Sequence, residues 1–133
     1  MPVPRKGQPL QVLIVSDNPE TLDALVKYLG AAGATVAGTR ELERCAEMTP
    51  GGASAVVLFP DDFEKQTVLD TLHDLGVHRP NTLPVLVTSE SKQFRALPAA
   101  TGRVAPLIVP KPVWGWTLLD AIRAELESRD SQR

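Results

Sequence analysis

Side chains suited to phosphate chemistry follow the ends of four short apolar runs in this sequence. They are Ser16-Asp17, Phe59-Pro60-Asp61-Asp62, Thr88-Ser89 and Lys111-Pro112. An acid, a hydroxyl and a lysine that converge on one crevice can cradle a metal-bound phosphoryl group, because carboxylates hold the cation and the donors neutralise the phosphoryl oxygens. These residues can act together only if the fold brings the four run ends to one edge.

The apolar runs predict five strands. Four consecutive branched residues, Val12-Leu13-Ile14-Val15, are too few for a buried helix and are typical of a strand covered on both faces. The same pattern predicts further strands at Ala34–Gly38, Ala55–Phe59, Val85–Val87 and Leu107–Val109.

Amphipathic stretches between the strands predict five helices. Asn18 is suited to cap a helix that begins at Pro19 and stops at Gly30 and Gly33. Further helices are predicted for Glu41–Met48, for the stretch from Asp61-Asp62 to Gly76, for Ser89–Ala100 and for Thr117–Glu127. The side chains expected to point inward are Leu22, Leu25, Val26, Leu29, Leu42, Cys45, Val68, Leu69, Leu72, Leu75, Phe94, Leu97, Leu118, Leu119, Ile122 and Leu126.

Strands that alternate with helices indicate an α/β fold, a doubly wound parallel sheet with helices on both faces. In such a sheet the functional crevice lies beyond the carboxyl ends of the strands, near the point where strand order reverses. We therefore expect the four run ends to line one crevice.

Length and composition indicate one domain in a reducing compartment. The chain has 133 residues, which suits a single domain over residues 11–127, an N-terminal extension at 1–10 and a tail or linker at 128–133. A net charge of −2 disfavours direct binding of nucleic acid. The single cysteine, the missing secretory leader and the absence of a long apolar run predict a cytoplasmic protein without a membrane segment.

Most of the sequence resembles a known family. The stretches VLIVSDNPETLDALVKYL, PVLVTS and IVPKPV resemble the receiver domain of two-component response regulators, from about Gln11 to Leu126. The resemblance implies the CheY-like, flavodoxin-like three-layer sandwich with strand order 2-1-3-4-5. It also implies a bacterial phosphorelay signalling protein that is not an enzyme.

The resemblance assigns roles to the residues at the strand ends. Such receivers hold a divalent metal with two acids after the first strand and accept phosphate on an aspartate that ends the third. Asp17 matches the second acid, and Ser89, or otherwise Thr88, matches the hydroxyl that contacts the phosphoryl group. Lys111 matches the phosphoryl-binding lysine, and Pro112 matches a proline whose peptide bond is usually cis.

Three positions depart from the family pattern. Ser16 replaces the first acid, Phe59 stands at the phosphoacceptor position, and Ile108 replaces an aromatic residue that relays the switch. An aromatic ring cannot attack phosphorus, and loss of one acid weakens a magnesium site. These losses predict a receiver of the pseudo-receiver type, with no cofactor and with a vestigial pocket formed by Ser16, Asp17, Phe59, Pro60, Thr88, Ser89, Lys111 and Pro112.

The acids that follow Phe59 have two interpretations. Asp61 or Asp62 is well suited to cap the next helix. In the alternative, a bulge at the strand end brings one of them into the crevice as the phosphoacceptor, and Mg²⁺ is then required. Lys111 is expected to pair with Asp17, and a buried Phe59 ring would lie against the stem of Lys111.

Two tryptophans close to Lys111 suggest an interface. Trp114 and Trp116 cannot easily both fold back into a core, and tryptophan is a frequent interface anchor. Together with Ile108 they predict a contact surface for a protein partner or a homodimer, on the face formed by the fourth helix, the fifth strand and the last helix. His73 and His78 are expected on the surface, and Cys45 in the core.

Three functions follow in order of preference. The first is an atypical receiver that is not phosphorylated and acts through protein–protein contact. The second is a phosphorylatable receiver that uses Asp61 or Asp62, for example as the regulatory domain of a DNA-binding transcription factor. The third is a flavodoxin-like binder of a nucleotide or flavin, which Ser16-Asp17-Asn18-Pro19 disfavours because such a loop should be rich in glycine or hydroxyl residues.

Overall fold

Short strands and helices alternate along the chain, as the apolar pattern indicates. The structure is a computed structural model and describes residues 10–49, 53–79, 81–90, 106–111 and 113–131. Its strands are β1 (Gln11–Val15), β2 (Thr35–Thr39), β3 (Ala55–Leu58), β4 (Leu83–Thr88) and β5 (Leu107–Pro110). Its helices are α1 (Pro19–Ala31), α2 (Cys45–Met48), α3 (Lys65–His78) and α5 (Gly115–Ser131), with 3₁₀ turns η1 (Leu42–Arg44) and η2 (Pro60–Asp62).

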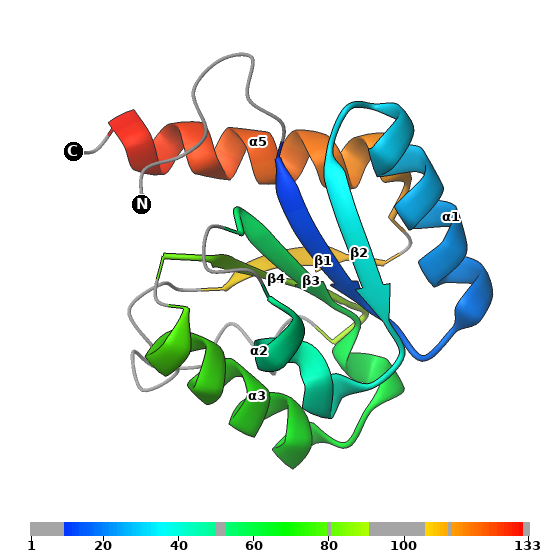
Figure 1. Cartoon of the computed structure of the whole chain (residues 1–133), viewed down its shortest axis with the longest axis vertical. Coiled ribbons are helices and arrows are strands. Elements are labelled where there is room, and N and C mark those ends of the chain that lie inside the picture. Colours follow the sequence, from blue (N-terminus) through cyan, green and yellow to red (C-terminus); the bar gives the residue numbers. More distant parts are fainter. Residues whose placement is uncertain (1–9, 50–52, 80, 91–105, 112, 132–133) are drawn as a thin grey trace.

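The strands form one parallel sheet in the order β2-β1-β3-β4-β5. Helices α1 and α5 cover one face of this sheet, and α2 and α3 cover the other (Figure 1). This arrangement confirms the predicted α/β class, the doubly wound sheet and the strand order.

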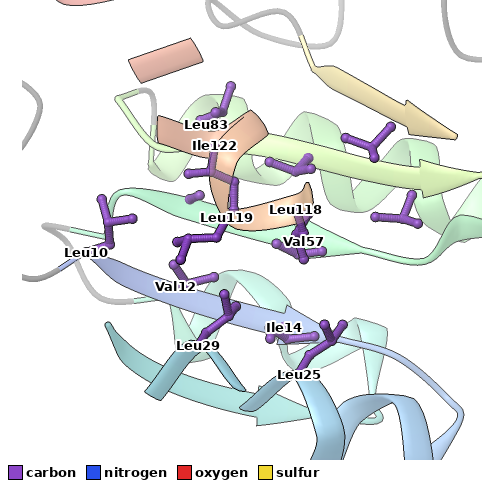
Figure 2. Packing of buried hydrophobic residues seen from close by; sticks show 14 of the residues in the cluster. Leu10, Val12, Ile14, Leu25, Leu29, Val57, Leu83, Leu118, Leu119 and Ile122 are labelled. Carbon is purple, nitrogen blue, oxygen red and sulfur yellow. The ribbon is translucent and has the colours of Figure 1, made fainter. Parts of the chain in front are cut away.

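Strands β1, β3, β4 and β5 each contribute to two separate cores, because successive side chains point to opposite faces. Val12 and Ile14 of β1 pack toward α1 and α5, whereas Leu13 and Val15 pack toward α2 and α3. Figure 2 shows the first core, where α1 and α5 supply Leu25, Leu29, Leu118, Leu119 and Ile122. Burial on both faces explains why β1, β3 and β4 have continuous apolar sequences.

Helix α1 begins and ends as its sequence predicts. The side chain of Asn18 accepts hydrogen bonds from the backbone N–H groups of Glu20 and Thr21, at 2.9 and 3.2 Å. Gly33, just past the end of the helix, has a φ of 103°, a conformation that favours glycine.

Several element boundaries differ from those predicted. Gly76 lies inside α3, because the buried Leu72 and Leu75 hold the helix against the sheet, and this packing outweighs the cost of a glycine, about 1 kcal/mol. The Glu41–Met48 segment is divided between η1 and α2. Helix α5 starts at Gly115 and continues beyond Glu127 to Ser131.

Some expectations fall on residues outside the described ranges. These are the cis proline Pro112, most of the helix predicted at Ser89–Ala100 and most of the N-terminal extension. Leu10, at the end of that extension, is buried in the core. Among the helices in the described ranges, none is both long and apolar enough to cross a membrane.

Candidate functional site at the carboxyl ends of the strands

The parallel register brings the predicted site residues to one edge of the sheet. Val15 pairs with Leu58, Leu58 pairs with Leu86, and Thr88 pairs with Pro110. Two further backbone hydrogen bonds extend this order past the strand ends. The N–H of Phe59 donates to the Val15 carbonyl at 3.2 Å, and the N–H of Lys111 donates to the Thr88 carbonyl at 3.3 Å.

The carboxylate of Asp61 lies at the centre of this edge, because η2 turns the chain back over the ends of β3 and β4. Its Oδ1 accepts a hydrogen bond from the hydroxyl of Thr88 at 2.5 Å. Its Oδ2 accepts from the backbone N–H of Ser89 at 2.9 Å and from the Ser89 hydroxyl at 3.1 Å. The Nζ of Lys111 lies 3.3 Å from the same oxygen.

These contacts stabilise the charged form of Asp61. Partial burial would raise the pKa of this carboxyl, but hydrogen bonds from Thr88 and Ser89 and the charge of Lys111 outweigh it and lower the pKa. The side chain of Asp61 is 19% exposed, whereas the whole residue, with its backbone included, counts as exposed. The N–H of Glu90 donates to the Thr88 hydroxyl at 2.9 Å, which leaves the hydroxyl proton to point at Asp61.

Asp62 points to the neighbouring strand end. Its Oδ2 accepts from the hydroxyl of Ser16 at 3.2 Å and from the N–H of Asp17 at 3.3 Å. The predicted capping role for Asp61 or Asp62 is therefore wrong. Helix α3 has Glu64 at its cap without a side-chain hydrogen bond, since η2 separates the two aspartates from the helix.

The predicted ion pair between Asp17 and Lys111 is also wrong. Asp17 faces outward and pairs with Arg40 at 3.5 Å, while Lys111 pairs with Asp61. The turn η2 places the Asp61 carboxylate within 3.3 Å of the Lys111 ammonium group.

The acidic side chains at this edge do not fit a magnesium ion. The carboxylates of Asp17, Asp61 and Asp62 are directed to Arg40, to Lys111 and to the Ser16 hydroxyl respectively. Within the described ranges, no three His, Cys, Asp or Glu side chains are close enough together to hold a metal ion. A hard divalent cation needs several converging oxygen ligands, and this donor set does not provide them.

Phe59 lies beside this polar cluster, at the end of β3. Phe59 is 5% exposed and packs in the core on the α1 and α5 side of the sheet. The Nζ of Lys111 lies 5.9 Å from the centre of the Phe59 ring. This contact confirms the predicted packing of the ring against the lysine.

Trp114 and Trp116 are both on the surface, with 61% and 54% of their area exposed. Their rings stack on each other, with centroids 5.5 Å apart and planes 5° apart. Neither indole therefore folds back into the core. Ile108, predicted to share a surface with them, is half-buried and packs against the core on the α2 and α3 side.

The two indoles line a groove together with residues of α1 and of the start of α5. The groove has a volume of about 790 Å³. Its lining combines aromatic and apolar side chains with a few polar ones: Ser16, Asn18, Thr21, Ala24, Leu25, Tyr28, Phe59, Asp62, Lys111, Val113, Trp114, Gly115 and Trp116. The Trp residues thus face α1.

Sequence reasoning missed three residues that shape this edge. Tyr28 and Gly115 bring α1 and α5 together, since a Cβ on Gly115 would lie only 2.5 Å from the Tyr28 ring. The glycine between two tryptophans was the available signal. Arg40, the partner of Asp17, follows the end of β2 and gave no comparable signal.

The remaining candidates match their expectations. His73 and His78 are exposed, and Cys45 is buried. Burial raises the pKa of the Cys45 thiol to about 12, against a smaller opposing effect of Thr49, so this thiol stays protonated and unreactive at neutral pH.

The lowered pKa of Asp61 predicts a pH-dependent contribution to stability. Its stabilising effect should be complete above the usual carboxyl pKa, near about 4, and be lost as the pH falls through the lower folded-state value. Because the pair is partly exposed, Asp61→Asn should cost about 1 kcal/mol or less at neutral pH. Urea unfolding of both proteins at several pH values measures the difference, which should vanish in acid; a constant difference would contradict it.

Comparison with known proteins supports the fold. No family model matches the sequence, and no curated protein matches it. A receiver domain protein from Methanospirillum hungatei JF-1 superposes with a TM-score of 0.74 at 20% identity, covering 95% of this chain and 100% of its own. A receiver domain protein from Clostridium thermocellum gives 0.74 at 16%, covering 93% and 99%. The signal receiver domain of an HD domain-containing protein from Pseudomonas fluorescens Pf-5 gives 0.73 at 19%, covering 93% and 99%.

Proposed function

We propose that this chain, which has the fold of receiver domains, is an atypical receiver of a two-component pathway that is not phosphorylated and acts by binding a protein. The fold likeness supports the receiver class. The edge of the sheet where phosphoryl chemistry would occur supports the proposal that the chain is not phosphorylated. The hydrogen-bond donors at this edge already contact a carboxylate of the protein.

The observation that carries the proposal is the position of Asp61. The lysine and hydroxyls that the family resemblance assigns to phosphoryl oxygens instead contact the Asp61 carboxylate. A carboxylate and a phosphoryl group present similar oxygens to such donors. The protein therefore supplies its own anion to this pocket.

Transfer of phosphate to this pocket would face three obstacles. Phe59, at the acceptor position, has no nucleophilic atom. Both oxygens of Asp61 accept hydrogen bonds, which lowers their reactivity. The neighbouring acids do not converge on a position for a divalent metal, which would otherwise neutralise the charge of the incoming group.

The second candidate is a receiver that is phosphorylated on Asp61. This reading is favoured by the same contacts, because an acceptor should lie near Lys111 and the Thr88 hydroxyl. Asp62 is a weaker choice, since its carboxylate is turned to Ser16. A DNA-binding output domain would fit either candidate.

A flavodoxin-like binder of nucleotide or flavin has less support. The loop after β1 uses its polar groups to cap α1, through Asn18, and to hold Asp62, through Ser16 and Asp17. Its backbone N–H groups are therefore committed within the protein, whereas a phosphate site needs them directed at the ligand.

Exposure to a small phosphodonor tests the proposal. We expect the intact mass of the protein to remain unchanged after incubation with Mg²⁺ and acetyl phosphate, while a receiver with a complete acidic site gains one phosphoryl group. Trp114 and Trp116 line the same groove as Lys111, so their fluorescence would report a phosphoryl group bound at the lysine; we expect it to stay unchanged.

Variants identify the acceptor if an adduct does form. A stoichiometric adduct on the wild-type chain would contradict the proposal. Its loss in Asp61→Asn, with retention in Asp62→Asn, would establish the second candidate with Asp61 as acceptor, and the reverse pattern would identify Asp62.

A further inference from the structure

The outer edge of β2 presents backbone hydrogen-bonding groups that no described residue occupies. Among the described strands, β2 is the last of the sheet and pairs only with β1 (Figure 1). The N–H of Thr35 and the carbonyl of Thr39 are bonded to the residues just before and just after β1, at 2.7 and 3.2 Å. Because the backbone groups of successive residues in a strand alternate in direction, Val36 and Gly38 turn theirs outward. The edge therefore offers N–H donors and carbonyl acceptors to another strand.

The features that normally protect an edge strand are absent from β2. Proteins block such edges with proline, with charged side chains or with bulges, since open backbone groups pair with further strands. The sequence of β2, TVAGT, has neither proline nor a charge, and its register with β1 is uninterrupted. Arg40, which follows β2, is turned to Asp17 beyond the end of β1, at 3.5 Å.

The opposite edge of the sheet, formed by β5, has such protection. The N–H of Lys111 donates to β4, at the Thr88 carbonyl. The alternation of backbone groups therefore places Pro110 at an outward position, and proline has no N–H to offer there. Of the two edges, β2 is the one that remains open to a further strand.

The outward groups of β2 are arranged to pair with a second copy of the same strand. In an antiparallel pair, two residues opposite each other exchange both of their backbone hydrogen bonds, and the next pair along exchanges none. A two-fold axis through Ala37, perpendicular to the sheet, places Val36 of one copy opposite Gly38 of the other. Every outward group of β2 then gains a partner, and Ala37 lies opposite its own equivalent.

A hollow beside Gly38 fits the side chain that this register brings there. Its volume is about 630 Å³, and it is lined by Pro19, Glu20, Leu22, Asp23, Val26 and Gly38. Residues opposite each other in an antiparallel pair project their side chains to the same face of the sheet, and Val36 faces α1. The Val36 side chain of the second copy therefore lies over Gly38, next to Leu22 and Val26.

The charges on α1 favour a second copy over a strand of another protein. Asp23 and Lys27 are one helix turn apart and largely exposed. Gly38 lies beside Val26, so an axis through the neighbouring Ala37 crosses α1 near its middle. The axis reverses the direction of the helix, so Asp23 of each copy comes to face Lys27 of the other. An unrelated strand would satisfy the backbone groups but would not bring these opposite charges.

We propose that two copies of this chain associate through their β2 strands, antiparallel about a two-fold axis at Ala37, and form one continuous sheet. The proposal goes beyond the function proposed above and does not rest on it. The interface also differs from the one that the sequence suggests for a homodimer, with Ile108 and the two tryptophans. Because the second sheet runs antiparallel to the first, the two Lys111 sites lie at opposite edges of the joined sheet.

The oligomeric state of the full chain, measured by analytical ultracentrifugation over a range of concentrations, tests the proposal. We expect a reversible equilibrium between monomer and dimer. Ala37 is exposed, so Ala37→Lys leaves the monomer folded while it places like charges opposite each other at the axis. This variant should weaken dimerisation by about 10-fold or more. Val77→Lys, which adds the same charge at an exposed position of α3, should leave dimerisation unchanged.

A mixture of two variants tests the register. Ala37→Glu should weaken self-association as much as Ala37→Lys does, and circular dichroism of both variants controls for loss of the fold. An equimolar mixture of the two should associate at least as tightly as the wild-type chain, because opposite charges then meet at the axis. Amide hydrogen exchange at Val36 and Gly38 should slow as the concentration rises, whereas exchange at Ala37, whose N–H faces β1, should not change.

Several outcomes would overturn the inference. One is a chain that stays monomeric at all concentrations up to about 1 mM. Others are a dimer that does not respond to Ala37→Lys, and a mixture of the two charged variants that does not restore association. A dimer that Trp116→Ala breaks and Ala37→Lys does not would assign self-association to the start of α5 instead. The phosphodonor experiment is independent of each of these results.

Discussion

Replacement of Phe59 by alanine is expected to lower the free energy of unfolding by about 3 kcal/mol. Removal of a buried phenylalanine side chain costs about 3–5 kcal/mol, through lost transfer energy and the cavity that remains. The lower value is expected because Phe59 borders an open groove, so water can enter the space that the ring leaves. The measurement is equilibrium unfolding in urea, followed by circular dichroism.

The control for this prediction is Val77→Ala. Val77 is 59% exposed, so its truncation should change stability by less than about 0.5 kcal/mol. If Phe59→Ala changed stability equally little, the ring would not be part of the core. The proposal that a packed Phe59 replaces the phosphoacceptor would then be refuted.

Replacement of Gly115 by alanine is expected to destabilise the protein by about 1–3 kcal/mol. A Cβ at this position would lie 2.5 Å from Cδ1 and 2.7 Å from Cγ of Tyr28. The Tyr28 ring cannot relieve this overlap by turning in place, because Cγ lies at its base; the whole side chain or the start of α5 must move. Thermal and urea unfolding measure the loss.

Two variants test that explanation. Gly30→Ala in α1 meets no atom within 4 Å, so it should stabilise the helix by about 0.5–1 kcal/mol. Combination of Gly115→Ala with Tyr28→Ala should recover most of the loss, since the overlapping ring is gone. A loss that persists in the double variant would mean that the backbone of Gly115, and not the ring, sets the requirement.

The fold could be predicted from the sequence because its signals are local and repeated. Continuous apolar runs as short as Val12–Val15 are typical of strands buried on both faces, and Asn18-Pro19 is a local signal for a helix start. Gly76 was wrongly predicted to end the helix, because a glycine disfavours a helix locally wherever it occurs. The packing of Leu72 and Leu75 determines that the helix continues past it.

The sequence predicted which residues form the site, but not how those residues pair with one another. The strand ends identified Thr88, Ser89 and Lys111, because parallel strands place their carboxyl ends at one edge. The pairing was wrong for Asp17 and for the two aspartates of η2. Which acid pairs with Lys111 depends on the path of the three-residue turn η2. From the sequence alone, Asp17 and Asp61 are both acids that could pair with this lysine.

The groove could not be predicted at all, since it depends on the distance between two helices. That distance is set by the contact between Gly115 and Tyr28, which are far apart in sequence. The two tryptophans signalled a surface, but only the tertiary structure shows that they face α1 rather than another element.

The arrangement of Phe59, Asp61 and Lys111 also determines what a substitution at position 59 can do. An aspartate at position 59 would lie against the same lysine that Asp61 already occupies. Two carboxylates that share one cation repel each other, so one of them would hold its proton and lose its value as an acceptor. We therefore expect an aspartate introduced at position 59 alone to compete with Asp61 for Lys111, so that Asp61 must change as well before the introduced carboxylate can pair with the lysine.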